Sequence, residues 1–285
     1  MKSRPASPER EVPHSAVEVD FPPLRLRPES ARTSQHIAAP RLAESGNIDP
    51  QMQSFTSGGR RIEVEWFAAS GGSAGGNGNG TSRPAVLLLH GADGLTFAEG
   101  YRLAARTIAA LGYHVAFVHY LDRTSDRRVA YTRLRQDFPL WAETVRDAVA
   151  WLADQPGIDA QRLGIVGISL GAALAFTTAM TEPRVRAIVD YFGPLPDELA
   201  RERPRLPPTL ILHGSADAIV PVSHARALER LLLEQGTAHE IKIYEGQGHG
   251  LTGPAQLDAA ARVARFLGQH LQPTVAESST SFARA

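Results

Sequence analysis

The pentapeptide at positions 167–171, Gly-Ile-Ser-Leu-Gly, joins an apolar segment to a run of small residues, and this junction constrains the fold more than any other feature. The preceding residues 163–166 are apolar and partly β-branched, which is typical of a buried strand. The following residues 172–176 are mainly alanine and leucine, which favour a helix. Because glycine tolerates tight and strained backbone, the sequence predicts a sharp turn at Ser169 between the strand and the helix.

A serine between two glycines at such a junction has the G-x-S-x-G pattern of a nucleophile elbow. The turn would hold the Ser169 hydroxyl above the sheet, at the start of a helix whose dipole favours negative charge. In the alternative interpretation, Ser169 only caps the helix. We favour the elbow, and with it acyl-transfer chemistry, because the strand and the helix lie where the pattern requires them.

Composition excludes several classes of function. The 30 basic and 30 acidic side chains cancel, so we expect neither nucleic acid nor a membrane surface as a partner. No apolar run approaches the ~20 residues of a transmembrane helix, and no apolar segment follows the basic N-terminus as in a secretory signal. The absence of cysteine excludes disulfides and thiolate nucleophiles. We expect a cytoplasmic protein, and its oligomeric state stays open.

Three regions differ in composition. Residues 1–50 are rich in proline and lack periodicity, so we expect a disordered or loosely docked extension. Residues 51–271 are expected to form the folded domain, and 272–285 a flexible tail. The glycine-rich tract 71–80 is expected to form a flexible hairpin turn, because neither a helix nor a Lys-Ser/Thr pair follows it as in a phosphate-binding loop.

Strands and helices alternate along the domain. Strands are expected at 61–67, 85–90, 114–120, 163–166, 185–191, 209–213 and 240–244. Helices are expected at 97–111, 138–153, 172–176, 223–234 and 254–271. Strands connected by helical crossovers predict an α/β fold with a mostly parallel central sheet and helices on both faces. In such a sheet, functional groups gather at the carboxyl ends of the strands.

Two further strand ends carry partners for the serine. Asp217 follows the strand at 209–213, and His249 lies between glycines after the strand at 240–244. The order Ser…Asp…His is the one used with a nucleophile elbow, so we expect His249 to act as general base and Asp217 to orient it. Alternatives are a turn-forming role for Asp217, Asp190 as the acid, and an ordinary loop histidine. No ligand spacing predicts a metal site.

The segment 90–94, His-Gly-Ala-Asp-Gly, follows another strand and is expected to supply an oxyanion loop. Its donor would be the backbone N–H of Ala92, and the second donor would be the N–H of Leu170. We expect His90 to be a buried imidazole that binds loop carbonyls and takes no direct part in catalysis.

These stretches resemble the α/β-hydrolase superfamily and, within it, the dienelactone hydrolase family. The resemblance extends over roughly residues 52–271, and its matching segments are 88–91, 112–115, 151–153, 164–171, 213–217 and 244–250. It implies an α/β-hydrolase fold with little or no separate cap domain. True dienelactone hydrolases use cysteine at the elbow, whereas this chain has Ser169 and no cysteine. The sequence therefore favours an ordinary ester hydrolase over one acting on dienelactones.

Two arginine-rich insertions, 121–136 and 192–206, are expected to line the substrate pocket. Arg123 and Arg127 could bind an acidic part of the substrate, although a solvated charged surface is the favoured alternative. We expect a serine hydrolase that cleaves carboxylic esters of small molecules without a cofactor. Cleavage of thioesters or peptides, and a non-catalytic binding protein on the same fold, stay open as alternatives.

Overall fold

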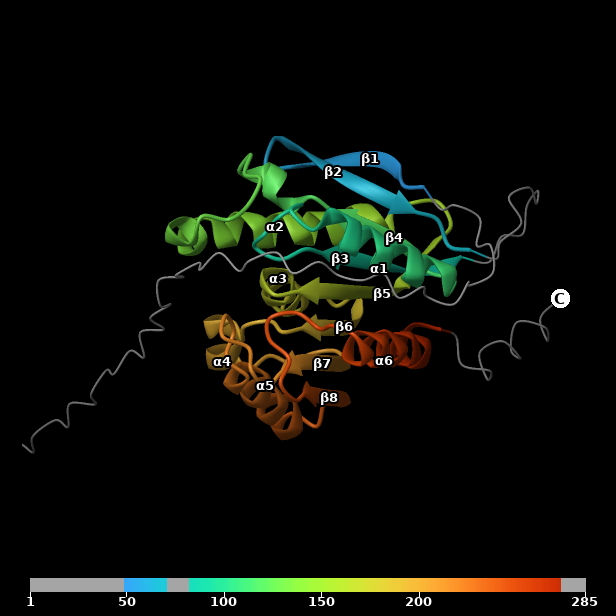
Figure 1. The fold of residues 1–285 in the computed structure, drawn as a ribbon. Coiled ribbons are helices and arrows are strands. Elements are labelled where there is room, and N and C mark those ends of the chain that lie inside the picture. The colour runs from blue at the N-terminus through green and yellow to red at the C-terminus, as the bar shows by residue number, and fades with distance from the viewer. Residues whose placement is uncertain (1–48, 71–81, 273–285) are drawn as a thin grey trace, which may run out of the picture. The chain divides into compact units, whose positions relative to one another are not determined.

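The structure, a computed structural model, describes residues 49–70 and 82–272 (Figure 1). The expected N-terminal extension up to residue 48, the glycine tract 71–80 and the tail after residue 272 lie outside the described residues. Within the described part, the first strand begins at Gln51 and the last helix ends at Leu271.

The centre of the fold is a mostly parallel sheet. Its strands are β1 (Gln51–Ser57), β2 (Arg60–Phe67), β3 (Arg83–Leu89), β4 (His114–Val118), β5 (Ile158–Ile168), β6 (Val185–Tyr191), β7 (Thr209–Gly214) and β8 (His239–Tyr244). They lie side by side in the order β1-β2-β4-β3-β5-β6-β7-β8, from top to bottom in Figure 1. β1 and β2 pair antiparallel, as do β2 and β4, and the other neighbours pair parallel. The expected parallel sheet is confirmed.

Helices cover both faces of the sheet, as expected (Figure 1). They are α1 (Ala98–Ala110), α2 (Leu134–Ala153), α3 (Leu170–Ala179), α4 (Asp197–Glu202), α5 (Ser223–Glu234) and α6 (Pro254–Leu271), with the 3-10 turns η1 (Tyr120–Arg123) and η2 (Tyr131–Arg133). One core cluster joins α1 and α6 to the sheet, and the other joins α2, α3, α4 and α5 to the opposite face. Among the described residues, the insertions contain only η1, η2, α4 and the first residues of α2, so no separate cap domain is found there.

The central strands carry long apolar runs because both of their faces are covered. In β3 the six residues from Pro84 to Leu89 are buried, and β7 is buried along its whole length. α3 is apolar on every side and all of its residues except Thr177 are buried. A helix of this kind belongs in the core, because it has no polar face to present to water.

Some boundaries differ from the sequence expectation. β1 was not expected, because Gln51–Ser57 is mostly polar and carries only Met52 and Phe55 as large apolar side chains. It forms through pairing with β2 across the tight turn at Gly58 and Gly59. α2 begins at Leu134, four residues before the expected start, and contains Pro139 in its second turn.

Within residues 49–70 and 82–272, no helix combines the length and apolar composition that crossing a membrane requires.

Candidate active site

Ser169 lies in a strained turn between the end of β5 and the start of α3. Its backbone has φ 53° and ψ −115°, in a region that residues with a side chain rarely adopt. A Cβ atom at Gly167 would lie 2.5 Å from the backbone nitrogen of Ala172, and one at Gly171 would lie 2.4 Å from the Leu89 carbonyl oxygen. Both flanking positions must therefore be glycine, because a side chain at either one would collide with the backbone.

The structure brings Ser169, His249 and Asp217 together. His249 Nε2 lies 2.9 Å from Ser169 Oγ, and His249 Nδ1 lies 2.7 Å from Asp217 Oδ2. The three residues follow β5, β8 and β7, whose carboxyl ends meet at one edge of the parallel sheet. The sequence therefore identified three side chains that the fold joins in one continuous hydrogen-bonded series.

Asp217 is held in place by several donors. Its Oδ1 accepts the backbone N–H groups of Ile219 and Val220 at 2.8 and 2.9 Å, and its Oδ2 faces His249. Burial alone would raise the pKa of Asp217, but the hydrogen bonds from His249 and from the Val220 and Ile219 N–H groups outweigh it and lower the pKa. The carboxylate is therefore charged at neutral pH and fixes His249 with Nδ1 protonated.

The loop 90–94 lies beside the nucleophile. A Cβ atom at Gly91 would lie 3.5 Å from Ser169 Cβ, so the loop backbone passes close to the hydroxyl. Among the described residues, the N–H groups of Ala92 and Leu170 have no hydrogen-bond acceptor. Leu170 directly follows Ser169 and Ala92 directly follows Gly91, so both unpaired N–H groups belong to segments next to the Ser169 side chain.

His90 is buried in this loop, as the sequence suggested. Its Nδ1 lies 2.8 Å from the Gly91 carbonyl oxygen, and its ring stacks on Tyr120 with 4.2 Å between centroids. Burial lowers the pKa of His90 to about 4, so the imidazole is neutral at physiological pH. These contacts are those of a residue that supports the loop.

Asp190, the alternative acid, has a different partner. It is fully buried at the end of β6, and its Oδ1 accepts the N–H of Gly193 at 2.7 Å. Its Oδ2 has no partner among the described residues. Burial raises the pKa of Asp190 to about 7. Asp217, and not Asp190, is the carboxylate bonded to His249.

Phe192 belongs to the site but was missed by sequence reasoning. It is buried beside His249, with 4.8 Å between ring centroids, although its φ of 45° is unfavourable for a bulky residue. Its N–H donates to the Leu212 carbonyl at 2.8 Å, which holds the segment against β7. No sequence signal marks an aromatic residue with positive φ, because this conformation is imposed by tertiary contacts.

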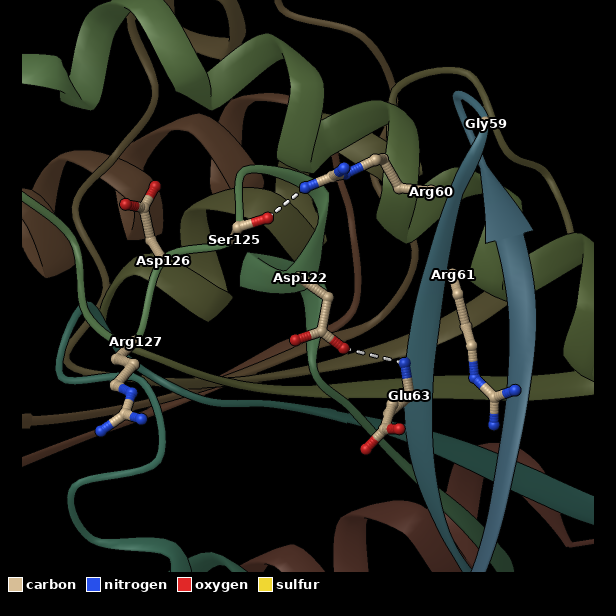
Figure 2. Close-up of a pocket in the computed structure, with 8 residues that line it drawn as sticks. All are labelled: Gly59, Arg60, Arg61, Glu63, Asp122, Ser125, Asp126 and Arg127. Carbon is tan, nitrogen blue, oxygen red and sulfur yellow. Dashed lines mark hydrogen bonds between the residues drawn. The ribbon is translucent and has the colours of Figure 1, made fainter.

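Arg123 and Arg127, which the sequence placed at the substrate, have other surroundings. Arg123 Nη2 pairs with Glu143 at 2.9 Å, and its guanidinium lies against Gly58 in the β1–β2 turn. Arg127 lines a pocket of about 500 Å³ (Figure 2). The other residues that line this pocket are Gly59, Arg60, Arg61, Glu63, Asp122, Ser125 and Asp126.

Figure 2 shows the Arg61 and Arg127 side chains on opposite sides of Asp122, while the Arg60 side chain donates to the Ser125 hydroxyl. Neither Arg123 nor Arg127 hydrogen-bonds to Ser169, Asp217 or His249. Arg127 is exposed, as the favoured alternative of a charged surface expects, whereas the Arg123 side chain is only 11% exposed and is paired with Glu143 inside the fold.

No group of three or more potential metal ligands is found in the described part of the chain.

Comparisons with known proteins agree with this architecture. Residues 73–270 match the model of the Dienelactone hydrolase family. The Escherichia coli esterase YpfH is 26% identical over 152 residues, which are 53% of this chain and 60% of that protein. Acyl-protein thioesterase 1 of Eremothecium gossypii is 33% identical over 111 residues, which are 36% of this chain and 47% of that protein. The chain thus spans about half the length of the curated relatives it matches.

The likeness extends to solved structures. A dienelactone hydrolase from Anabaena variabilis has a TM-score of 0.62 at 21% identity, over 79% of this chain and 100% of that one. At this identity the likeness concerns the fold, and it confirms the α/β-hydrolase fold expected from the sequence. Since the family model covers most of residues 51–271 and the fold agrees with it, the chain belongs to the dienelactone hydrolase family.

Proposed function

We propose that this protein is a serine hydrolase that cleaves carboxylic esters of small molecules. The observation that carries the proposal is the continuous series of hydrogen bonds from Asp217 through His249 to Ser169, at 2.7 and 2.9 Å. A serine hydroxyl is a weak nucleophile, and an imidazole oriented by a carboxylate is what activates it.

The proposed cycle follows from the geometry. His249 Nε2 takes the proton of Ser169 Oγ as this oxygen attacks the ester carbonyl carbon, and Asp217 stabilises the imidazolium that forms. The N–H groups of Ala92 and Leu170 bind the oxyanion. His249 then protonates the leaving alcohol. A water molecule, deprotonated by His249, attacks the acyl-enzyme; the bond from the acyl carbon to Ser169 Oγ breaks, His249 returns the proton to Oγ, and the acid is released, so the cycle requires no cofactor.

The surroundings of Ser169 support an uncharged substrate. The side chain that packs on His249 is the aromatic ring of Phe192, and partly buried Ile168, Tyr191 and Leu251 belong to the neighbouring apolar cluster. Arg123 is already paired with Glu143. We therefore propose esters with neutral, apolar acyl groups, and not anionic lactones, as the substrates.

The test is a substrate panel. It contains p-nitrophenyl esters of increasing acyl length, acyl-CoA thioesters and short peptides, each with the wild type and with the Ser169→Ala variant. We expect turnover of the neutral p-nitrophenyl esters by the wild type only, and labelling of Ser169 by a fluorophosphonate probe. A preference for thioesters or peptides would favour those alternatives, and failure of the probe to label folded protein would favour a non-catalytic role.

A further inference from the structure

The oxyanion loop is fixed by hydrogen bonds along its backbone. Each carbonyl oxygen of residues 90–93 accepts at least one hydrogen bond. The Tyr120 hydroxyl donates to residues 90 and 91, and His90 Nδ1 and the Gly94 N–H also bond to residue 91. The Val129 N–H donates to residue 92, and the Thr96 N–H and hydroxyl donate to residue 93. The Ala92 N–H is left without an acceptor among the described residues, which is the state an oxyanion donor needs.

The N–H of Gly91, next to this donor, is engaged by a side chain of α1. It donates to the Tyr101 hydroxyl oxygen at 3.1 Å, and the Tyr101 hydroxyl in turn donates to Asp93 Oδ1 at 2.7 Å. Burial, followed by the hydrogen bond to Asp93, raises the pKa of Tyr101 well above its ordinary range, so this hydroxyl keeps its proton. Tyr101 can therefore accept and donate at the same time.

Asp93 completes a closed arrangement within the loop. Its Oδ1 lies 2.7 Å from the position that a Cβ atom of Gly91 would occupy, so the carboxylate is packed against the Gly91 backbone. Its Oδ2 is buried and has no hydrogen-bond partner among the described residues.

We propose that Asp93 and Tyr101 are positioning residues for catalysis. Together they hold the Gly91 N–H away from the substrate and fix the next peptide so that the Ala92 N–H faces the developing oxyanion. This inference rests on the proposed esterase function, because it assigns the residues that prepare the oxyanion site of that reaction.

We call the hydrogen bonds from the Gly91 N–H to Tyr101 and from Tyr101 to Asp93 the Asp93–Tyr101 brace. The effect of breaking it can be judged from what one oxyanion donor contributes to kcat. Losing such a donor outright costs about 10²–10³ in kcat. In Tyr101→Phe the donor is still present but its orientation is no longer fixed, so we expect kcat to fall by about 10 to 100-fold. KM should stay within about twofold, because the ground-state carbonyl gains little from the oxyanion donors.

The experiment compares four variants on the best neutral ester of the panel. Tyr101→Phe keeps the ring and loses both hydrogen bonds, and Asp93→Ala removes the acceptor. Asp93→Asn keeps an oxygen that accepts from Tyr101 and should retain kcat within about threefold. The matched control is Tyr244→Phe, which loses a hydroxyl that donates to Asp258 at 2.9 Å on α6 and should behave as the wild type.

The second readout is the affinity of a trifluoromethyl ketone, which adds the Ser169 hydroxyl to form a hemiketal whose oxyanion mimics the transition state. In Tyr101→Phe and Asp93→Ala this affinity should fall by the same factor as kcat/KM. A role limited to stability would instead lower the melting temperature and leave the kcat of the folded enzyme unchanged.

A kcat of Tyr101→Phe within twofold of the wild type would overturn the inference, as would an Asp93→Asn variant as impaired as Asp93→Ala. Wild-type protein that hydrolyses no ester and is not labelled at Ser169 would overturn the proposed function and the brace together. Wild-type activity with an unimpaired Tyr101→Phe would overturn the brace alone.

Discussion

Replacing Asp190 by asparagine should change how the stability of the protein depends on pH. The native pKa of Asp190 is raised from 3.8 to about 7 by burial, and the Gly193 N–H offsets only part of this cost. Between these two values the native state retains a proton that the unfolded chain releases. The free energy of unfolding therefore falls as pH rises from about 4 through 7, and the contribution of Asp190 is lost above pH 7.

The size of this effect follows from the pKa difference. A shift of about 3 units corresponds to about 4 kcal/mol at 1.36 kcal/mol per unit. Asparagine cannot ionise, so this pH dependence should vanish in Asp190→Asn. The amide keeps an oxygen that accepts the Gly193 N–H. Its NH₂ group takes the place of Oδ2, which has no partner among the described residues, and burying this unpaired group lowers the unfolding free energy by an amount that does not vary with pH.

The assay is urea unfolding at half-unit intervals from pH 5 to pH 8.5. The quantity of interest is the difference in unfolding free energy between Asp190→Asn and the wild type, which should increase by about 3 kcal/mol in favour of the variant across this range. Gln161→Ala, which replaces an exposed side chain that cannot ionise, is the control and should give a flat difference. A flat difference for Asp190→Asn, or one that decreases with pH, would refute the reasoning.

The remaining predictions concern the site and the charged surface. Asp217→Asn should lower kcat for the preferred ester by about 10³–10⁴, because His249 loses the carboxylate that sets its tautomer. Steady-state kinetics measure kcat and KM separately. Phe192→Ala and Phe192→Gly should each lower kcat by roughly 10-fold, because the His249 imidazole loses the ring that packs on it. In urea unfolding the glycine variant should be about 1 kcal/mol more stable than the alanine variant, because glycine adopts φ 45° without strain. Arg123→Gln should lower the unfolding free energy by about 1–3 kcal/mol and change KM equally for anionic and neutral esters; a selective rise in KM for anionic esters would instead restore its substrate role.

Much of the sheet could be predicted from the sequence, because buried parallel strands form continuous apolar runs. β3 and β7 have this property, and their positions match the expected strands. β1 does not, since Gln51–Ser57 is mostly polar. Its stability comes from the ladder with β2 and from Phe55, which stacks on Trp151 of α2 with 5.7 Å between centroids, and no local pattern reveals either contact.

The candidate catalytic residues could be located from the sequence because each follows a strand, and parallel strands end at one edge. The sequence favours Asp217 over Asp190 because Asp217 follows its strand, whereas Asp190 lies inside an apolar strand beside aromatic residues. In the structure the two differ in their partners, His249 for Asp217 and the Gly193 N–H for Asp190. The Asp93–Tyr101 brace could not be predicted, because it depends on the angle at which α1 approaches the loop.

The burial of α3, in which nine of ten residues are buried, affects the motions of the site. A helix packed on all sides exchanges its amide hydrogens only when the whole domain unfolds, whereas the half-exposed loop 245–250 around His249 can open locally. Hydrogen exchange should therefore find the amides of 171–176 among the most protected and those of 246–250 among the least. In the proposed mechanism, heat or mild denaturant would then abolish activity first by releasing His249, while Ser169 keeps its position in a still folded core.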